Sequence, residues 1–97
     1  MTTYKLSSDA EDDLKRIYSY GLKTFGEKQA DLYLDQLLDC FETIVDSPFS
    51  FVSVDNIYPG HRRCVCGVDS VYYRIGNDFI EIVAIVGRQE LNKALNK

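Results

Sequence analysis

Positively charged residues and tyrosines gather in the second half of the chain, and their chemistry suits the binding of anions. An arginine side chain binds phosphate or carboxylate through two parallel hydrogen bonds, and a nearby tyrosine can stack on a base or donate a hydrogen bond. Such a group could hold RNA for metal-independent cleavage, with an arginine stabilising the charged transition state, or it could bind an acidic protein surface. The arginines could also simply solvate a sheet edge and pair with Glu81 or Glu90. This basic cluster consists of His61, Arg62, Arg63, Tyr72, Tyr73, Arg74 and Arg88.

Other kinds of catalytic or metal site find little support in the sequence. The glycines are scattered turn residues and form no phosphate-binding motif. His61 and Cys64 could act as a nucleophilic pair only with a third, orienting group, so we interpret Cys64 as a small core residue. A single histidine leaves a zinc site short of ligands, and we predict no metal and no cofactor. Four carboxylates follow one side of a predicted helix and indicate a solvated face: Asp31, Asp35, Asp39 and Glu42.

The three cysteines are Cys40, Cys64 and Cys66. Cys64 and Cys66 are two residues apart in a predicted strand, so their side chains point to the same face and are badly placed for a mutual disulfide. We therefore expect buried or half-buried free thiols in a reducing compartment.

Length and composition indicate one globular domain over residues 1–97, with 45% hydrophobic and 27% charged residues. No stretch approaches the ~20 apolar residues of a membrane span, and the N-terminus has no apolar signal segment. We therefore expect a cytoplasmic protein with no membrane contact. The formal net charge is −4, and residues 1–50 hold ten acidic against five basic side chains. Such an acidic half disfavours wrapping nucleic acid broadly.

Two helices are predicted in the first half of the chain. Ser8 and Glu11 form a capping-box pair, and apolar residues then recur at helical spacing as far as Gly26, a natural left-handed stop. A second amphipathic helix starts almost at once and ends near Asp46, because Pro48 cannot continue a helix. So short a connection predicts an antiparallel helical hairpin.

The strands lie on either side of this hairpin. Residues 3–6 alternate polar and apolar and predict a short strand, whereas residues 47–59 show no period and predict a loop. Residues 60–86 predict three strands of a meander, rich in β-branched and aromatic side chains. Residues 89–97 have apolar residues at helical spacing and could form a short tail helix. The order β-α-α-β-β-β predicts an α+β fold, with the hairpin packed on a small, mainly antiparallel sheet.

The helices are apolar over more than one stripe, which indicates that a partner covers part of the hairpin. Tyrosine is enriched at protein interfaces, and the chain has seven. The surplus apolar residues are Tyr18, Tyr20, Leu22, Leu32 and Tyr33.

Several segments resemble the ParE toxins, within the RelE/ParE superfamily of type II toxin–antitoxin systems. Residues 25–37, FGEKQADLYLDQL, are similar to the family's aromatic-Gly-x-x-Gln-Ala-x-x-Tyr-x-x-x-Leu segment. Residues 60–63, GHRR, resemble the family's approach to the sheet, and residues 71–74, VYYR, follow at the expected spacing. The chain departs from the family pattern at Gly87, where the last strand usually runs into a histidine, and at Phe51, where a glycine is common.

The resemblance implies a RelE/ParE-like fold and a toxin neutralised by a cognate ParD-like antitoxin, whose helix packs on the helical hairpin while an extended part adds to the sheet. ParE members lack the catalytic residues of the RelE ribonucleases and poison DNA gyrase. The implied function is therefore gyrase inhibition by a protein that is not an enzyme. The alternatives are a ribosome-dependent mRNA endoribonuclease and a degenerate protein that binds antitoxin without toxicity.

These implications assign two sets of candidate contact residues. The toxin alone is not expected to bind DNA sequence-specifically. Candidate contacts with the target are His61, Arg62, Arg63, Tyr73, Arg74 and Arg88, and candidate contacts with the antitoxin are Tyr18, Tyr20, Leu22, Leu32 and Tyr33.

Overall fold

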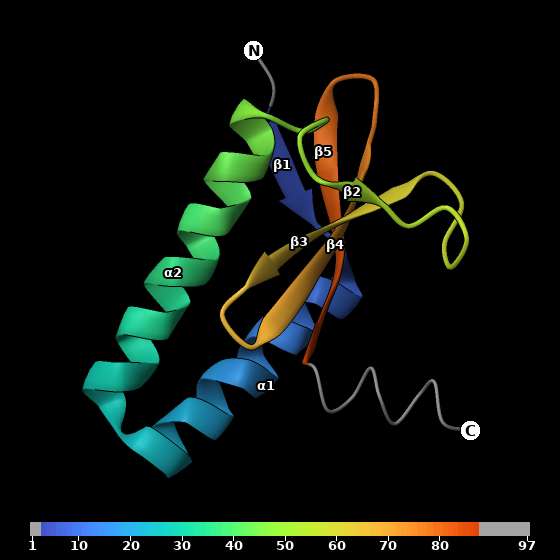
Figure 1. Ribbon diagram of the computed structural model, residues 1–97. Coiled ribbons are helices and arrows are strands. Elements are labelled where there is room, and N and C mark those ends of the chain that lie inside the picture. The colour runs from blue at the N-terminus through green and yellow to red at the C-terminus, as the bar shows by residue number, and fades with distance from the viewer. Residues whose placement is uncertain (1–2, 88–97) are drawn as a thin grey trace.

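The computed structural model describes residues 3–87, and the predicted tail helix over residues 89–97 lies outside this range. Two helices pack on a five-stranded mixed sheet, and Figure 1 shows them joined at one end and diverging along the sheet. The predicted α+β fold is therefore confirmed. No described helix is both long and apolar enough to span a bilayer. The elements are β1 (Thr3–Leu6), α1 (Ser8–Phe25), α2 (Glu27–Asp46), β2 (Val52–Ser53), β3 (His61–Cys66), β4 (Asp69–Ile75) and β5 (Phe79–Gly87).

The strand order in the sheet is β1-β5-β4-β3-β2. β1 is parallel to β5 because the helical hairpin carries the chain away before the meander begins, and the other neighbours are antiparallel. The sequence missed β2, whose two residues pair with Arg62 and Arg63 inside the predicted loop. So short a strand shows no period of its own, and only the neighbouring β3 orders it.

The core lies between the helices and one face of the sheet. Successive strand side chains alternate between faces, so every second residue of β3, β4 and β5 points at the helices. A bulge in β5 beside Tyr72 and Tyr73 shifts this alternation by one residue. The buried cluster consists of Ala10, Leu37, Phe41, Ile44, Cys64, Cys66, Val71, Tyr73, Ile80, Ile82 and Ile85.

The start of α1 is fixed by Ser7 instead of the predicted Ser8. The Ser7 hydroxyl accepts a hydrogen bond from the Ala10 amide at 3.0 Å and donates one to the Val83 carbonyl at 2.7 Å. One serine therefore caps the helix and ties its first turn to β5. Sequence reasoning placed the cap one residue late because Ser7 and Ser8 have the same capping chemistry.

The two helices meet at Gly26, which has a φ of 92° and closes α1 by donating its amide to the Gly21 carbonyl. They approach closely there, because a β-carbon at Gly21 would lie 3.3 Å from the β-carbon of Ala30. The helical hairpin predicted from the connection length is thus a tightly packed corner.

The expectation that all three cysteines are free is wrong. Cys40 of α2 and Cys66 of β3 form a disulfide, with their α-carbons 6.5 Å apart, and only Cys64 is a free, buried thiol. Cys64 and Cys66 share a face as predicted, but that face is the one that α2 covers. The partner of Cys66 therefore comes from the helix.

Candidate functional site

The sheet divides the basic cluster between its two faces. Arg62 pairs with Tyr73 across β3 and β4, on the face that packs against the helices. His61 pairs with Arg74, and Arg63 pairs with Tyr72, on the opposite face. We call this second surface the open face, because neither described helix covers it (Figure 1). The sequence predicted the residues of the cluster but not this separation.

Arg62 is held at the rim of the helix-side face. Its Nη1 donates a hydrogen bond to the Phe51 carbonyl at 2.7 Å, and its guanidinium lies 5.3 Å from the centre of the Phe49 ring. These contacts fix the segment before β2 on the sheet. Arg62 therefore helps to hold this segment in place, in addition to carrying a positive charge.

The basic side chains on the open face differ in how many interactions they make with neighbouring residues. Arg74 pairs with Glu81, with 2.6 Å between Nε and Oε1, as the simplest interpretation of the cluster anticipated. The ring nitrogen Nδ1 of His61 lies 3.0 Å from the Pro59 carbonyl, and its ring packs on Tyr58. Arg63 is less engaged, because its buried Nε has no hydrogen-bond partner among the described residues.

The Tyr72 hydroxyl also has no hydrogen-bond partner among the described residues. Tyr72 of β4 is the register partner of Arg63 of β3. Within residues 3–87, Arg63 Nε and Tyr72 Oη are the two buried side-chain polar atoms without a hydrogen bond. Leaving a buried donor unpaired costs free energy, so both atoms are energetically unfavourable as they stand. On the open face, the half-buried Arg63 side chain is a candidate for binding an anionic partner.

Tyr73 does not belong to this surface. Its side chain is fully buried among the core residues, and its hydroxyl donates a hydrogen bond to the Pro48 carbonyl. Burial raises the pKa of Tyr73 to about 12, although the nearby Arg62 charge lowers it. The alternation of β4 turns Tyr73 toward the helices together with Val71, so it is a core residue and not an accessible target contact. Arg88 lies outside the described residues.

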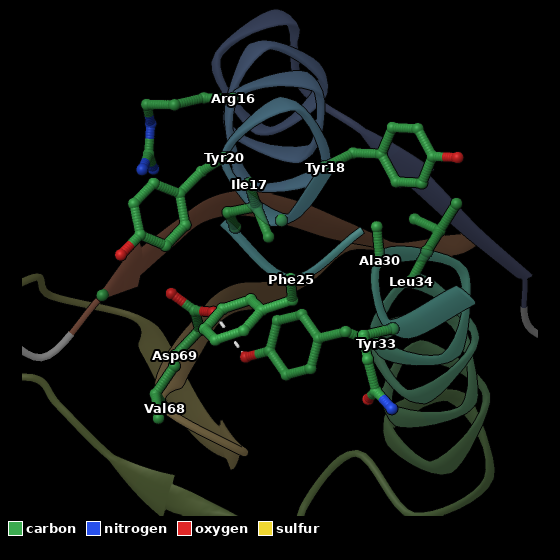
Figure 2. Close-up of a pocket in the computed structure, with 13 residues that line it drawn as sticks. Arg16, Ile17, Tyr18, Tyr20, Phe25, Ala30, Tyr33, Leu34, Val68 and Asp69 are labelled. Atoms are coloured by element: carbon green, nitrogen blue, oxygen red, sulfur yellow. Dashed lines mark hydrogen bonds between the residues drawn. The ribbon is translucent and has the colours of Figure 1, made fainter. Parts of the chain in front are cut away.

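A second candidate surface is a groove of about 710 Å³ near the corner of the two helices, shown in Figure 2. We call it the hairpin groove. Its walls come from the second half of α1, the first half of α2, the β3–β4 turn and the end of β5. It is lined by Arg16, Ile17, Tyr18, Tyr20, Gly21, Phe25, Gln29, Ala30, Tyr33, Leu34, Val68, Asp69 and Gly87.

The groove brings together Tyr18, Tyr20 and Tyr33, three of the five residues predicted to contact a partner. Leu22 and Leu32 are exposed but do not line it. Sequence reasoning missed two exposed apolar residues at its rim, Phe25 and Val68, which are 66% and 70% exposed. The helical period places Phe25 with the buried stripe of the first helix, and Val68 sits in a turn where no periodicity reveals its direction.

The floor of the groove is polar, which the sequence did not indicate. The Tyr33 hydroxyl donates to the Asp69 carboxylate at 2.5 Å and lies 3.1 Å from the Cys66 carbonyl (Figure 2). Burial raises the pKa of Tyr33 well above its ordinary value, and the hydrogen bond to Asp69 raises it further. Asp69 is only 6% exposed and is the one charged residue buried within residues 3–87. From sequence alone, an aspartate after Gly67 and Val68 resembles an ordinary turn residue.

Known proteins resemble this chain over nearly its whole length. A family model described as ParE toxin of type II toxin-antitoxin system, parDE, matches residues 4–92. Toxin ParE1 of Caulobacter vibrioides is 34% identical over 92 residues, which is 95% of this chain and 94% of the relative. Toxin ParE1 of Mycobacterium tuberculosis is 29% identical over 84 residues, which is 86% of each chain.

Solved structures show the same fold. A chromosomal ParDE toxin–antitoxin system from P. aeruginosa contains a chain that superposes with a TM-score of 0.79 at 19% identity, covering 90% of this chain and 96% of that one. A mutant of YafQ from E. coli superposes with a TM-score of 0.58 at 11% identity, covering 94% of this chain and 98% of that one. At these identities the likeness concerns the fold alone.

Proposed function

Because this chain belongs to the ParE toxin family of type II toxin–antitoxin systems, we propose that its target is DNA gyrase and that the open face makes the contact. The chain is the toxin component of such a system, and its partner is an antitoxin. The choice of gyrase rests on the resemblance to ParE toxins. The contact surface rests on Arg63, a half-buried side chain on the open face whose guanidinium can bind carboxylates of an acidic protein surface or DNA phosphates beside it.

The toxin acts by binding and not by catalysis. A ribonuclease would need an accessible base beside its arginines, but Tyr73 is fully buried in the core and Arg74 is paired with Glu81. A general base must come within hydrogen-bond reach of the proton that it removes. These observations support inhibition through contact. We expect no sequence-specific DNA binding by the toxin alone, and the net charge of −4 also disfavours broad electrostatic binding to DNA.

The antitoxin docks in the hairpin groove. A groove walled by tyrosines and Phe25 suits an amphipathic helix that buries one apolar face. An extended part of the antitoxin can add to the sheet beside β3, because β2 pairs only with Arg62 and Arg63. The outer edge of β3 from Cys64 to Cys66 therefore has no strand neighbour among the described residues.

A supercoiling assay with purified gyrase tests the target. The wild-type protein should inhibit supercoiling and trap cleaved DNA, and Arg63→Ala should lose about tenfold or more in potency if a charged hydrogen bond to the target is lost. Lys15→Ala is the matched control, since it removes one positive charge from an exposed position on α1. Circular dichroism establishes that each variant is folded.

A parallel assay in a translating extract separates the alternatives. Cleaved mRNA with gyrase untouched would identify a ribosome-dependent ribonuclease. Equal potency of Arg63→Ala and the wild type would remove the open face from the contact with gyrase. Absence of growth inhibition in cells, together with antitoxin binding, would identify a non-toxic binding protein.

A further inference from the structure

The floor of the hairpin groove holds a buried carboxylate without a positive partner among the described residues. The ion pairs of residues 3–87 join Arg16 to Asp13 and Arg74 to Glu81, and none of them includes Asp69. A buried charge is costly unless it is paired and hydrogen-bonded. Asp69 has a hydrogen bond from Tyr33 but no cation within this range, so its negative charge is only partly compensated.

Two glycines shape the space around this carboxylate. A β-carbon at Gly87 would lie 3.2 Å from Asp69 Oδ1, and a β-carbon at Gly67 would lie 2.8 Å from Tyr33 Cε1. A side chain at either position would crowd the pair. Gly87 is also the register partner of Asp69 across β4 and β5, and both residues line the groove. We call the site made by Tyr33, Gly67, Asp69 and Gly87 the Asp69 socket.

We propose that the Asp69 socket binds the ammonium or guanidinium group of a lysine or arginine from the antitoxin segment that occupies the hairpin groove. The inference rests on the proposed docking of the antitoxin in this groove and is independent of the toxin's target. It adds a polar specificity contact to an otherwise apolar surface.

Charge and shape both select a cationic side chain. A lysine or arginine has an apolar stem that can lie along Tyr20 and Phe25 while its charged end reaches the floor of the groove. The aromatic rings can also attract a cation through their faces. Arg16, the basic residue on the groove wall, is directed elsewhere, since its guanidinium lies 3.5 Å from Asp13 and 3.4 Å from the Ile85 carbonyl. Figure 2 shows it on the α1 side of the groove.

Synthetic peptides test the proposal without knowledge of the antitoxin sequence. Each is an amphipathic helix about four turns long, with leucines on one face and a single arginine or citrulline among them. The position of that residue is moved stepwise across the apolar face. Citrulline has nearly the shape of arginine but no charge, so each pair isolates the effect of the cation. Binding to the full chain is measured by fluorescence anisotropy of the labelled peptides.

At the best position, the arginine peptide should bind the wild type at least about tenfold more tightly than the citrulline peptide. Asp69→Asn should reduce this preference to within about twofold. Asp31→Asn should retain it. Asp31 is the matched control because it also accepts a tyrosine hydrogen bond, from Tyr18 at 2.6 Å, but on the exposed surface.

A second variant covers the case in which Asp69→Asn does not fold. Gly87→Ala keeps the carboxylate but places a methyl group against it, and it should weaken arginine binding more than citrulline binding. The proposal is overturned if the wild type shows no preference for arginine, if folded Asp69→Asn keeps the preference, or if no peptide binds. None of these results bears on gyrase inhibition, which is measured separately.

Discussion

Tyr73→Phe tests whether this tyrosine is a core residue or a contact with the target. The substitution removes one hydroxyl from a fully buried side chain and leaves the Pro48 carbonyl without its hydrogen bond. Breaking such a buried bond should lower the free energy of unfolding at neutral pH by roughly 1–3 kcal/mol. The proposed inhibition of gyrase should be unchanged in the folded variant, because the hydroxyl is not accessible.

The pH dependence gives a sharper result. The pKa of Tyr73 is about 12 in the folded protein, against an ordinary value of 10.0, so the folded protein holds this proton more tightly than the unfolded chain does. Stability from this difference is complete below pH 10 and is lost as the pH rises from 10 toward 12. At pH 11 the loss for this one group is about 1.4 kcal/mol.

Urea unfolding at pH 8 and pH 11 measures this loss. Between pH 8 and pH 11, the free energy of unfolding should fall for both proteins. The fall should be about 1.4 kcal/mol smaller for Tyr73→Phe than for the wild type. Tyr20→Phe is the control, because Tyr20 is 63% exposed. Removing its hydroxyl should change the free energy of unfolding at either pH by no more than about 0.5 kcal/mol. An identical pH dependence in Tyr73→Phe and the wild type would refute the assignment of a buried, neutral tyrosine.

Two further predictions concern the packing of α2 on the sheet. Leu37→Ala should lower the free energy of unfolding by about 2–5 kcal/mol, because Leu37 is fully buried, and a loss below about half a kcal/mol would mean that it faces solvent. Cys40→Ser should lower the free energy of unfolding by about 3–4 kcal/mol, as expected for opening a disulfide with a sequence separation of 26 residues. Dithiothreitol should destabilise the wild type similarly and leave Cys40→Ser unchanged, and insensitivity of the wild type would mean that its thiols are already free.

The helices and most of the strands could be predicted from the sequence because they depend on local periodicity. The apolar stripe of α2, which includes Leu37 and Phe41, is long enough to show helical spacing clearly. What the sequence could not provide depends on long-range contacts. The link between Cys40 and Cys66 follows from how α2 lies on β3, and the hydrogen bond from Ser7 to Val83 follows from how β1 lies beside β5.

The candidate sites divide in the same way. The residue types alone identified the basic cluster. The alternation of side chains along β3 could already have predicted that Arg62 and Arg63 point to opposite faces of the sheet. It could not say which face the helices cover, and Tyr72 and Tyr73 are both buried although they point to opposite faces. The burial of Asp69 could not be predicted from the sequence, for a different reason. Its burial arises from Tyr33, which is distant in sequence, and from the small size of its partner Gly87.

The placement of the two surfaces constrains how neutralisation can work. The hairpin groove lies on the helix side of the sheet, and the polar groups around Arg63 lie on the open face. An antitoxin helix confined to the groove would therefore leave the proposed target contact uncovered. A segment that pairs with the outer edge of β3 from Cys64 to Cys66 would end next to Arg63, because β2 already pairs with Arg62 and Arg63. We therefore expect the strand contact to block the target and the groove to supply affinity and selectivity.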